Sequence, residues 1–226
     1  MLRSHSISVK VFLAIILAVI SACSYDIAEP ERTPTIIGDS ILIDASGCSY
    51  RLHRFGSHLW VMENYRTTHT RDSLYTFNFI KYPNNTNFEI YYTQKAALEL
   101  VPKGWRVPNM SDFDTLLFYL GVNVETAGSE MKGIQGWSTP NYTSIFNLPA
   151  TGYAQKKTGD DLTRIDVFNT DSIGYLWLSA NGEYIYLTDT NDSLHVGYVG
   201  DSKEQYMPVR YVITKPAEIN EKDVDK

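Results

Sequence analysis

The chain has 226 residues, of which 43% are hydrophobic and 20% are charged, and its formal net charge at pH 7 is −6. This hydrophobic fraction is enough for a packed core and excludes a wholly disordered chain. The lysine and arginine residues are scattered along the sequence, which argues against nucleic acid as a partner.

A short apolar run over residues 11–20 follows a polar start that contains Arg3 and Lys10. It is shorter than the about 20 residues that a helix needs to cross a bilayer, and its length is typical of a secretory signal peptide. The run ends in "ISAC", residues 20–23, which resembles the lipobox of bacterial lipoproteins. We therefore expect a signal peptide over residues 1–22 and attachment of lipid to Cys23, which anchors the protein to a membrane.

Residues 23–34 are polar, contain proline and lack apolar periodicity, so we expect a flexible tether between the lipid and a folded domain. The acidic residues in this tether resemble the surface-export signals of Bacteroidetes lipoproteins. They predict an outer-membrane protein that is lipid-anchored and exposed at the cell surface. Residues 35–214 are the predicted domain, and residues 215–226 are a charged tail.

The chain has two cysteines, Cys23 and Cys48. Because the lipid would occupy the sulfur of Cys23, we expect no disulfide within the domain. Stability should then come from packing alone.

The first part of the domain predicts short antiparallel strands. Residues 35–65 contain three runs of alternating apolar residues, broken by turn residues at 44–47 and 56–57. Residues 66–87 are polar and predict a loop or insertion. The segment "FEIYYT", residues 88–93, predicts a further strand.

A short helix is expected next, over residues 94–100. Thr93 can cap its first turn, and it should end ahead of Pro102.

The clearest local signal is a second helix that begins after Asn109. Asn109 and Asp112 have the spacing of a capping box, and Gly121 is placed to end the helix. An apolar stripe at i, i+3, i+4 and i+7 is formed by Phe113, Leu116, Leu117 and Leu120. This pattern is typical of a helix that packs on a core without taking part in chemistry.

Residues 122–173 are rich in glycine and proline and predict a long, loop-rich middle. From residue 174 onward, four short runs with strand-like composition are separated by turn residues, which predicts an antiparallel meander. The fold class is therefore α+β, with antiparallel strands and two short helices.

Five segments in this order resemble one family, the Fibrobacter succinogenes major paralogous (FISUMP) domain of Bacteroidetes and Fibrobacteres lipoproteins. These segments are "FGSHLWVMENY" (55–65), "YYTQKAALELVPKGWRVPNMSDFDTLLFYLG" (91–121), "LPATGY" (148–153), "GYLWLSA" (174–180) and "MPVRYV" (207–212). The resemblance implies a C-type-lectin-like fold, in which the two ends of the domain pair and two helices flank the sheet. It also implies that Trp60, Trp105 and Trp177 belong to the scaffold.

One departure from the family pattern concerns a pair of cysteines. Relatives usually carry cysteine at the positions of Val101 and Tyr211, and the resemblance implies that those cysteines pair. Since both cysteines are replaced here, we expect packing, and not a disulfide, to hold the segments around Val101 and Tyr211 together.

No catalytic or cofactor motif stands out. The histidines do not have the spacing of a metal site, and no G-x-S-x-G segment occurs. For calcium, "TPN" (139–141) lacks the carboxylate that would complete a site, and "TDTNDS" (188–193) is more simply a β-turn. We expect a protein that is not an enzyme and needs no cofactor or metal.

Exposed loops then become the candidate binding residues for a glycan or protein ligand. The expected contacts are Trp137, Asn141 and Tyr142 in one loop, and Asn181 and Glu183 at a hairpin tip. For Trp137, packing against the core is an equally weighted alternative. Short Asp-Ser and Asp-Thr motifs also resemble the O-glycosylation acceptors of Bacteroidetes, at Ser40, Ser73, Ser172 and Ser193, with Thr115 placed inside a helix.

Three functions follow from these observations. The first is a lipid-anchored recognition or adhesion module, and the second is a structural subunit of a surface assembly. The third is an enzyme on the superfold of formylglycine-generating enzymes. Those enzymes act through a reactive pair of cysteines, which this chain is not expected to provide.

Overall fold

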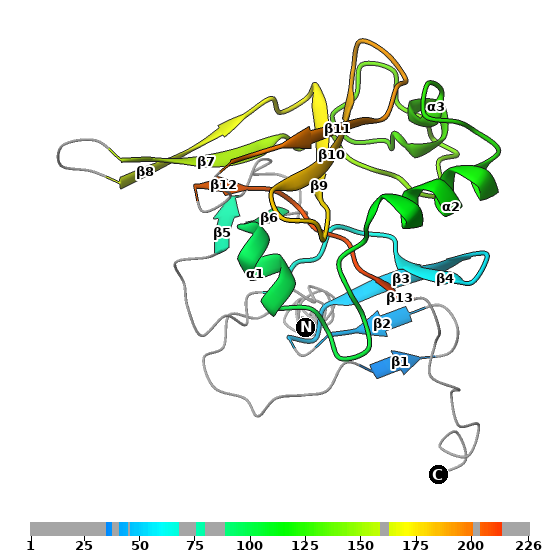
Figure 1. The fold of residues 1–226 in the computed structure, drawn as a ribbon, viewed down its shortest axis with the longest axis horizontal. Helices are drawn as coiled ribbons and strands as arrows, with labels where there is room; N and C mark the ends of the chain where they lie inside the picture. The colour runs from blue at the N-terminus through cyan, green and yellow to red at the C-terminus, as the bar shows by residue number, and fades with distance from the viewer. Residues whose placement is uncertain are drawn as a thin grey trace, which may run out of the picture.

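The computed structural model describes residues 35–37, 41–44, 46–67, 76–79, 89–158, 163–200 and 204–213. In this part of the chain, thirteen strands and three short helices alternate with long connections. All strand pairs among the described residues are antiparallel. The expected combination of antiparallel strands with a few short helices is confirmed (Figure 1).

The first sheet joins the two ends of the domain. Its strands lie in the order β1 (Thr35–Ile37), β2 (Ile41–Ile43), β3 (Ser49–Phe55), β4 (His58–Val61) and β13 (Val212–Ile213). Residues 35–65 form four strands and not the three expected, because the first run is divided into β1 and β2; both expected breaks are present. Val212 of β13 pairs with Trp60 of β4, so the end of the domain closes back on its beginning (Figure 1).

Three of the four runs expected to form a meander make up the second sheet, as β9 (Ile173–Trp177), β10 (Glu183–Thr188) and β11 (His195–Tyr198). The fourth run does not join them, because it forms β12 (Gln205–Tyr206) and β13, which pair with strands of other sheets. Leu176, Ile185 and Leu187 point to one face of this sheet and are fully buried. They belong to a core cluster that also contains Trp60 and Phe113, so the second sheet packs on the same interior as the first.

The prediction of an irregular middle was wrong in part. Residues 122–173 contain helix α3 (Ala127–Met131) and the hairpin of β7 (Tyr153–Thr158) and β8 (Thr163–Phe168). Strand β12 pairs with β7 as the third strand of this sheet. The sequence of β7 is largely polar and has no apolar alternation. Its pairing with β8 and β12, and the stacking of Tyr153 on Phe168 at 5.4 Å between ring centroids, stabilise it instead.

The expected loop at 66–87 is also interrupted, by strand β5 (Thr76–Phe79). This strand pairs with β6 (Glu89–Tyr92), the strand predicted from "FEIYYT".

Helix α1 (Gln94–Glu99) is confirmed with its predicted cap, since the Thr93 hydroxyl accepts a hydrogen bond from the Ala96 backbone N–H at 3.2 Å. Helix α2 (Met110–Leu120) is confirmed with the complete capping box. The Asn109 side chain accepts from the Asp112 N–H at 3.1 Å, and the Asp112 carboxylate accepts from the Asn109 N–H at 2.7 Å. Gly121 ends the helix with φ = 72°, a conformation that glycine adopts without steric cost.

The apolar stripe of α2 packs on the interior as predicted. Phe113, Leu116 and Leu117 are buried, while Leu120 is half-buried. The Phe113 ring meets the Trp60 ring edge-on, with 5.2 Å between centroids. The three tryptophans expected to be scaffold residues, Trp60, Trp105 and Trp177, are all buried.

Packing holds the corner at which relatives carry cysteine, as expected. Tyr211 is fully buried, and its hydroxyl donates to the Ala97 carbonyl of α1 at 2.9 Å. Val101 packs against the same core cluster. A buried hydrogen bond of this kind contributes about 1 kcal/mol to stability. Tyr211 therefore ties α1 to the chain just before β13.

The expectation of a domain without a disulfide was wrong. Cys48 is buried and disulfide-bonded, and its partner lies outside the described residues. Its backbone N–H also donates to the Asp44 carboxylate at 2.9 Å, so the turn after β2 is fixed by both.

Candidate functional site

The candidate site is a long loop, residues 133–150, which we call the docked loop. Its two ends are held together by backbone hydrogen bonds, from Gly133 N to Leu148 O at 2.9 Å and from Ala150 N to Gln135 O at 2.9 Å. The Asn147 side chain adds a bond from the Ile134 N–H at 3.0 Å. A loop closed at its base in this way is compact and can present side chains in fixed positions.

Polar side chains attach the body of the docked loop to helix α3. The Asn141 amide donates to the Ser129 carbonyl at 2.6 Å, and the Ser144 hydroxyl donates to the Glu130 carbonyl at 2.6 Å. The Asn141 Oδ1 atom also accepts from the Thr143 N–H at 2.8 Å, which forms a local turn. These contacts use both ends of the Asn141 amide, so its predicted role in ligand binding competes with a structural one.

Trp137 lies in the interior and not on the surface. Only 6% of the residue is exposed, and its indole N–H donates to the Leu148 carbonyl at 2.7 Å. The ring belongs to the core cluster that contains Trp60 and Phe113. This corrects the expectation that Trp137 offers an aromatic face to a ligand and favours the alternative that it packs against the core.

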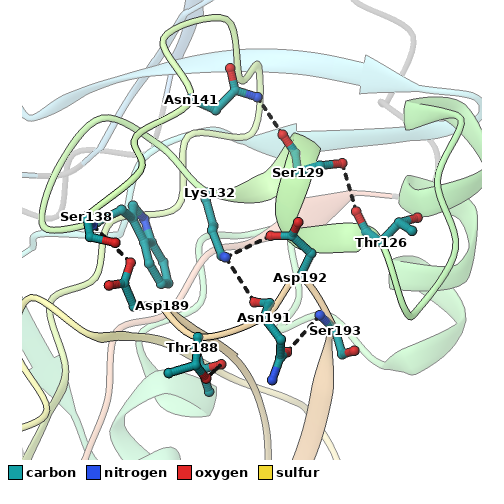
Figure 2. A network of polar contacts seen from close by, with 12 residues as sticks. Thr126, Ser129, Lys132, Ser138, Asn141, Thr188, Asp189, Asn191, Asp192 and Ser193 are labelled. Atoms are coloured by element: carbon teal, nitrogen blue, oxygen red, sulfur yellow. Dashed lines mark hydrogen bonds and ion pairs between the residues drawn. The ribbon is translucent and has the colours of Figure 1, made fainter.

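A buried lysine joins the docked loop to the turn between β10 and β11. The Lys132 ammonium lies 5.4 Å from the centre of the Trp137 ring and donates to the Asn191 carbonyl and the Asp192 carboxylate at 2.9 and 2.8 Å. Figure 2 shows Lys132 pointing at both partners. The Gly128 N–H donates to the Asp192 carbonyl at 2.7 Å. A side chain at Gly128 would meet the Asp192 backbone at 2.8 Å, so only glycine permits this approach.

The same turn contacts the docked loop through Asp189. The Ser138 N–H donates to the Asp189 carboxylate at 2.9 Å (Figure 2). The Ser138 hydroxyl, followed by this N–H, lowers the pKa of Asp189 by hydrogen bonding. The segments "TPN" (139–141) and "TDTNDS" (188–193) lie far apart in the sequence. They are close in the structure because Ser138, which precedes the first segment, bonds to Asp189 in the second.

The outer surface of the docked loop exposes large apolar side chains. Tyr142 is 75% exposed, and Ile134 and Ile145 are about half exposed. Tyr142 therefore lies where the sequence predicted it, on a surface available to a ligand. An aromatic ring with a polar hydroxyl on a rigid loop is a common recognition group.

Asn181 and Glu183 are at the opposite end of β10 from the turn that meets the docked loop. β10 runs from Glu183 to Thr188, and six residues of strand extend about 20 Å. The hairpin tip is fixed instead by Gln94 of α1, whose amide oxygen accepts from the Gly182 N–H at 2.8 Å. Asn181 is exposed, but the structure does not bring it into one site with Tyr142.

Two of the predicted glycosylation acceptors lie in described turns. Ser172 and Ser193 are half-buried, and the Ser172 hydroxyl donates to the Asn169 carbonyl at 3.1 Å. Thr115 lies inside α2, as expected. Ser40 and Ser73 lie outside the described residues. Glycosylation stays a prediction.

Among the described residues, no group of three or more His, Cys, Asp or Glu side chains has the arrangement of a metal site. No described helix is long and apolar enough to cross a membrane.

Sequence reasoning missed the residues that position the docked loop, namely Lys132, Asp189 and Asp192. The only local signal is a lysine next to the apolar Met131, which is unusual for a buried segment. Their partners lie about 60 residues away in the chain, as between Lys132 and Asp192, so no local pattern can reveal the contact.

Comparison with known proteins gives one positive finding. The family model of the Fibrobacter succinogenes major domain matches residues 54–213, which is more than half of the chain and spans β4 to β13. No curated protein and no solved structure matches. The matched range agrees with the five segments noted in the sequence, and the chain belongs to the Fibrobacter succinogenes major domain family.

Proposed function

We propose that this protein is a lipid-anchored cell-envelope protein whose docked loop recognises a glycan or a protein without catalysing a reaction. The observation that carries the proposal is the exposure of Tyr142, with Ile134 and Ile145, on a loop that is fixed at its base and along its body. A rigid loop loses little conformational entropy on binding, which favours recognition.

The finer fold assignment, C-type-lectin-like, is part of the same proposal. It is supported by the pairing of β13 with β4, which joins the ends of the domain around a long looped middle. Helices α1 and α2 lie against the core of this arrangement, as the resemblance implies.

The anchor and the location are proposed from the N-terminal sequence, "ISAC" at residues 20–23 and the acidic tether after it. We propose that in the mature protein the sulfur of Cys23 carries lipid in place of a disulfide, and that this lipid holds the protein in the outer membrane with the domain at the cell surface.

Replacing Tyr142 with serine is expected to weaken ligand binding at least tenfold, because the exposed ring supplies contact area that serine cannot replace. The measurement uses the full-length protein in detergent, on a glycan array and in pull-downs from envelope extracts. Tyr198→Ser is the matched control, since Tyr198 is 64% exposed on β11 and lies outside the docked loop.

Equal binding by wild type and Tyr142→Ser would contradict a role for the docked loop. Co-purification with a multi-subunit surface fibre, unaffected by Tyr142→Ser, would favour a structural subunit instead.

Cys23→Ala is expected to move the protein from the membrane fraction to the soluble fraction, because lipid attachment requires this thiol. Immunoblots of fractionated cells measure the change. Since a sulfur joined to lipid cannot also form a disulfide, the intact mass of the wild-type protein without reductant adds an independent readout. Full membrane retention of Cys23→Ala, or a wild-type mass without lipid, would contradict the anchor.

A further inference from the structure

A pocket of about 390 Å³, lined by charged, amide and apolar side chains, opens at the base of the docked loop. Ile134, Gln135, Asn147 and Pro149 line it from the two ends of that loop. The rest of the lining comes from Glu89, Arg210 and four residues that follow β4, namely Met62, Glu63, Asn64 and Arg66. The volume falls at the small end of the range for pockets that bind small molecules.

Arg210 forms one wall of the pocket and is fixed within it. It is 1% exposed, and its guanidinium donates to the Asn64 Oδ1 atom at 2.9 Å and to the Phe146 and Asn147 carbonyls. The Phe146 ring lies 4.5 Å from the guanidinium carbon. These partners occupy one N–H on each of the three guanidinium nitrogens, so two N–H groups remain for other acceptors.

The two carboxylates that line the pocket, Glu63 and Glu89, are also held in position. Glu63 accepts from the Arg51 backbone N–H at 2.8 Å and from the Arg51 side chain at 2.5 Å. Glu89 accepts from the Asn64 amide at 3.1 Å. Because Asn64 contacts both Arg210 and Glu89, it couples the cationic and anionic sides of the pocket.

Among the described residues that line the pocket, two carboxylates balance two guanidinium groups. The carboxylates are Glu63 and Glu89, and the guanidinium groups are Arg66 and Arg210. A ligand with a net charge would therefore be repelled by one pair as well as attracted by the other. A neutral ligand meets no such penalty.

The residues that line the pocket supply both hydrogen-bond donors and acceptors. Carboxylates only accept and guanidinium groups only donate, while a hydroxyl does both and can bridge the two. The Gln135 side-chain amide adds a donor and an acceptor that no group in the described part of the chain occupies. Ile134 and Pro149 supply an apolar surface beside these groups.

From the balance of charge, the presence of both donors and acceptors and the adjoining apolar surface, we infer that this pocket binds a neutral, hydroxyl-rich ligand, the terminal sugar residue of a glycan. The inference rests on the proposed recognition function and assigns it a ligand class and a second contact region. Tyr142 on the outer loop would then contact the glycan beyond its terminal residue.

The test measures binding of the full-length protein to an array of neutral, acidic and amino-sugar-terminated glycans. Gln135→Leu keeps the size of the side chain but removes the amide, and Glu63→Gln removes one carboxylate charge. We expect each to weaken binding of neutral glycans at least tenfold. The matched controls are Gln155→Leu at a half-buried position on β7 and Glu99→Gln at an exposed position on α1, and both lie outside the pocket. Unfolding by urea establishes that all four variants remain folded.

Loss of neutral-glycan binding in the two pocket variants, with binding retained in both controls, supports the inference. If Tyr142→Ser loses glycan binding while Gln135→Leu and Glu63→Gln keep it, the pocket is overturned and the recognition function stands. Binding restricted to charged glycans, or to a protein captured through Tyr142, also overturns the pocket alone. If the wild type binds neither glycan nor protein, the inference and the proposed function fail together.

Discussion

Arg210→Met is expected to lower the free energy of unfolding by about 3 to 5 kcal/mol, because two buried acceptors and one half-buried acceptor lose their donor. Methionine fills much of the same volume but donates no hydrogen bond, so the Asn64 side chain and the Phe146 and Asn147 carbonyls are left unsatisfied. Burial lowers the pKa of Arg210 to about 10, and nearby Glu63 and Glu89 oppose this shift. The guanidinium therefore remains charged at neutral pH.

Urea unfolding followed by tryptophan fluorescence measures this effect. Arg54→Met is the control, because Arg54 is exposed on β3 and its replacement should change stability by less than about 0.5 kcal/mol. A loss below about 1 kcal/mol for Arg210→Met would mean that water or a rearranged loop satisfies these carbonyls, and that Arg210 does not hold the docked loop.

Asp112→Ala is expected to cost about 2 to 4 kcal/mol, because this carboxylate serves two structures at once. It completes the capping box of α2 by accepting from the Asn109 N–H, and it accepts two hydrogen bonds from the Arg106 guanidinium at 2.5 and 2.6 Å. The carboxylate is 2% exposed, whereas the Arg106 side chain is 40% exposed, so water weakens part of the attraction.

Asp114→Ala provides the matched control on the same helix, since Asp114 is exposed two residues away. It should leave the urea midpoint nearly unchanged. Equal destabilisation by the two substitutions would show that general charge on α2, and not the position of Asp112, stabilises the helix.

Helix α2 could be predicted because its signals are local. Asn109, Asp112 and Gly121 fix its ends within the helix itself, and the apolar stripe fixes its buried face. The meander β9 to β11 was equally accessible, since each strand is followed by turn residues close in sequence.

The β7–β8 hairpin and helix α3 could not be found in the same way. β7 depends on pairing with β12, whose residues lie about 50 positions later, and its own composition is polar. Helix α3 has five residues and no side-chain cap, so it depends on contacts such as the one between Gly128 and Asp192.

Only part of the candidate site could be predicted, because some of its residues have local sequence signals and others depend on contacts between distant segments. Tyr142 could be placed on an exposed loop because glycine and proline bound that loop in sequence. Trp137 could not be assigned, because its burial depends on the fit of Lys132 and Leu148 around it. Arg210 contacts Asn64 across 146 residues of chain, and such a contact has no local signature.

Photo-crosslinking from position 142 tests the central claim most directly. A benzophenone amino acid replaces Tyr142 in one strain and Tyr198 in another, and intact cells are irradiated. We predict a higher-mass glycan or protein adduct from position 142 and none from position 198, because Tyr142 contacts the ligand while Tyr198 lies on β11, outside the docked loop. Adducts of equal yield from both positions, or from position 198 alone, would contradict recognition through the docked loop.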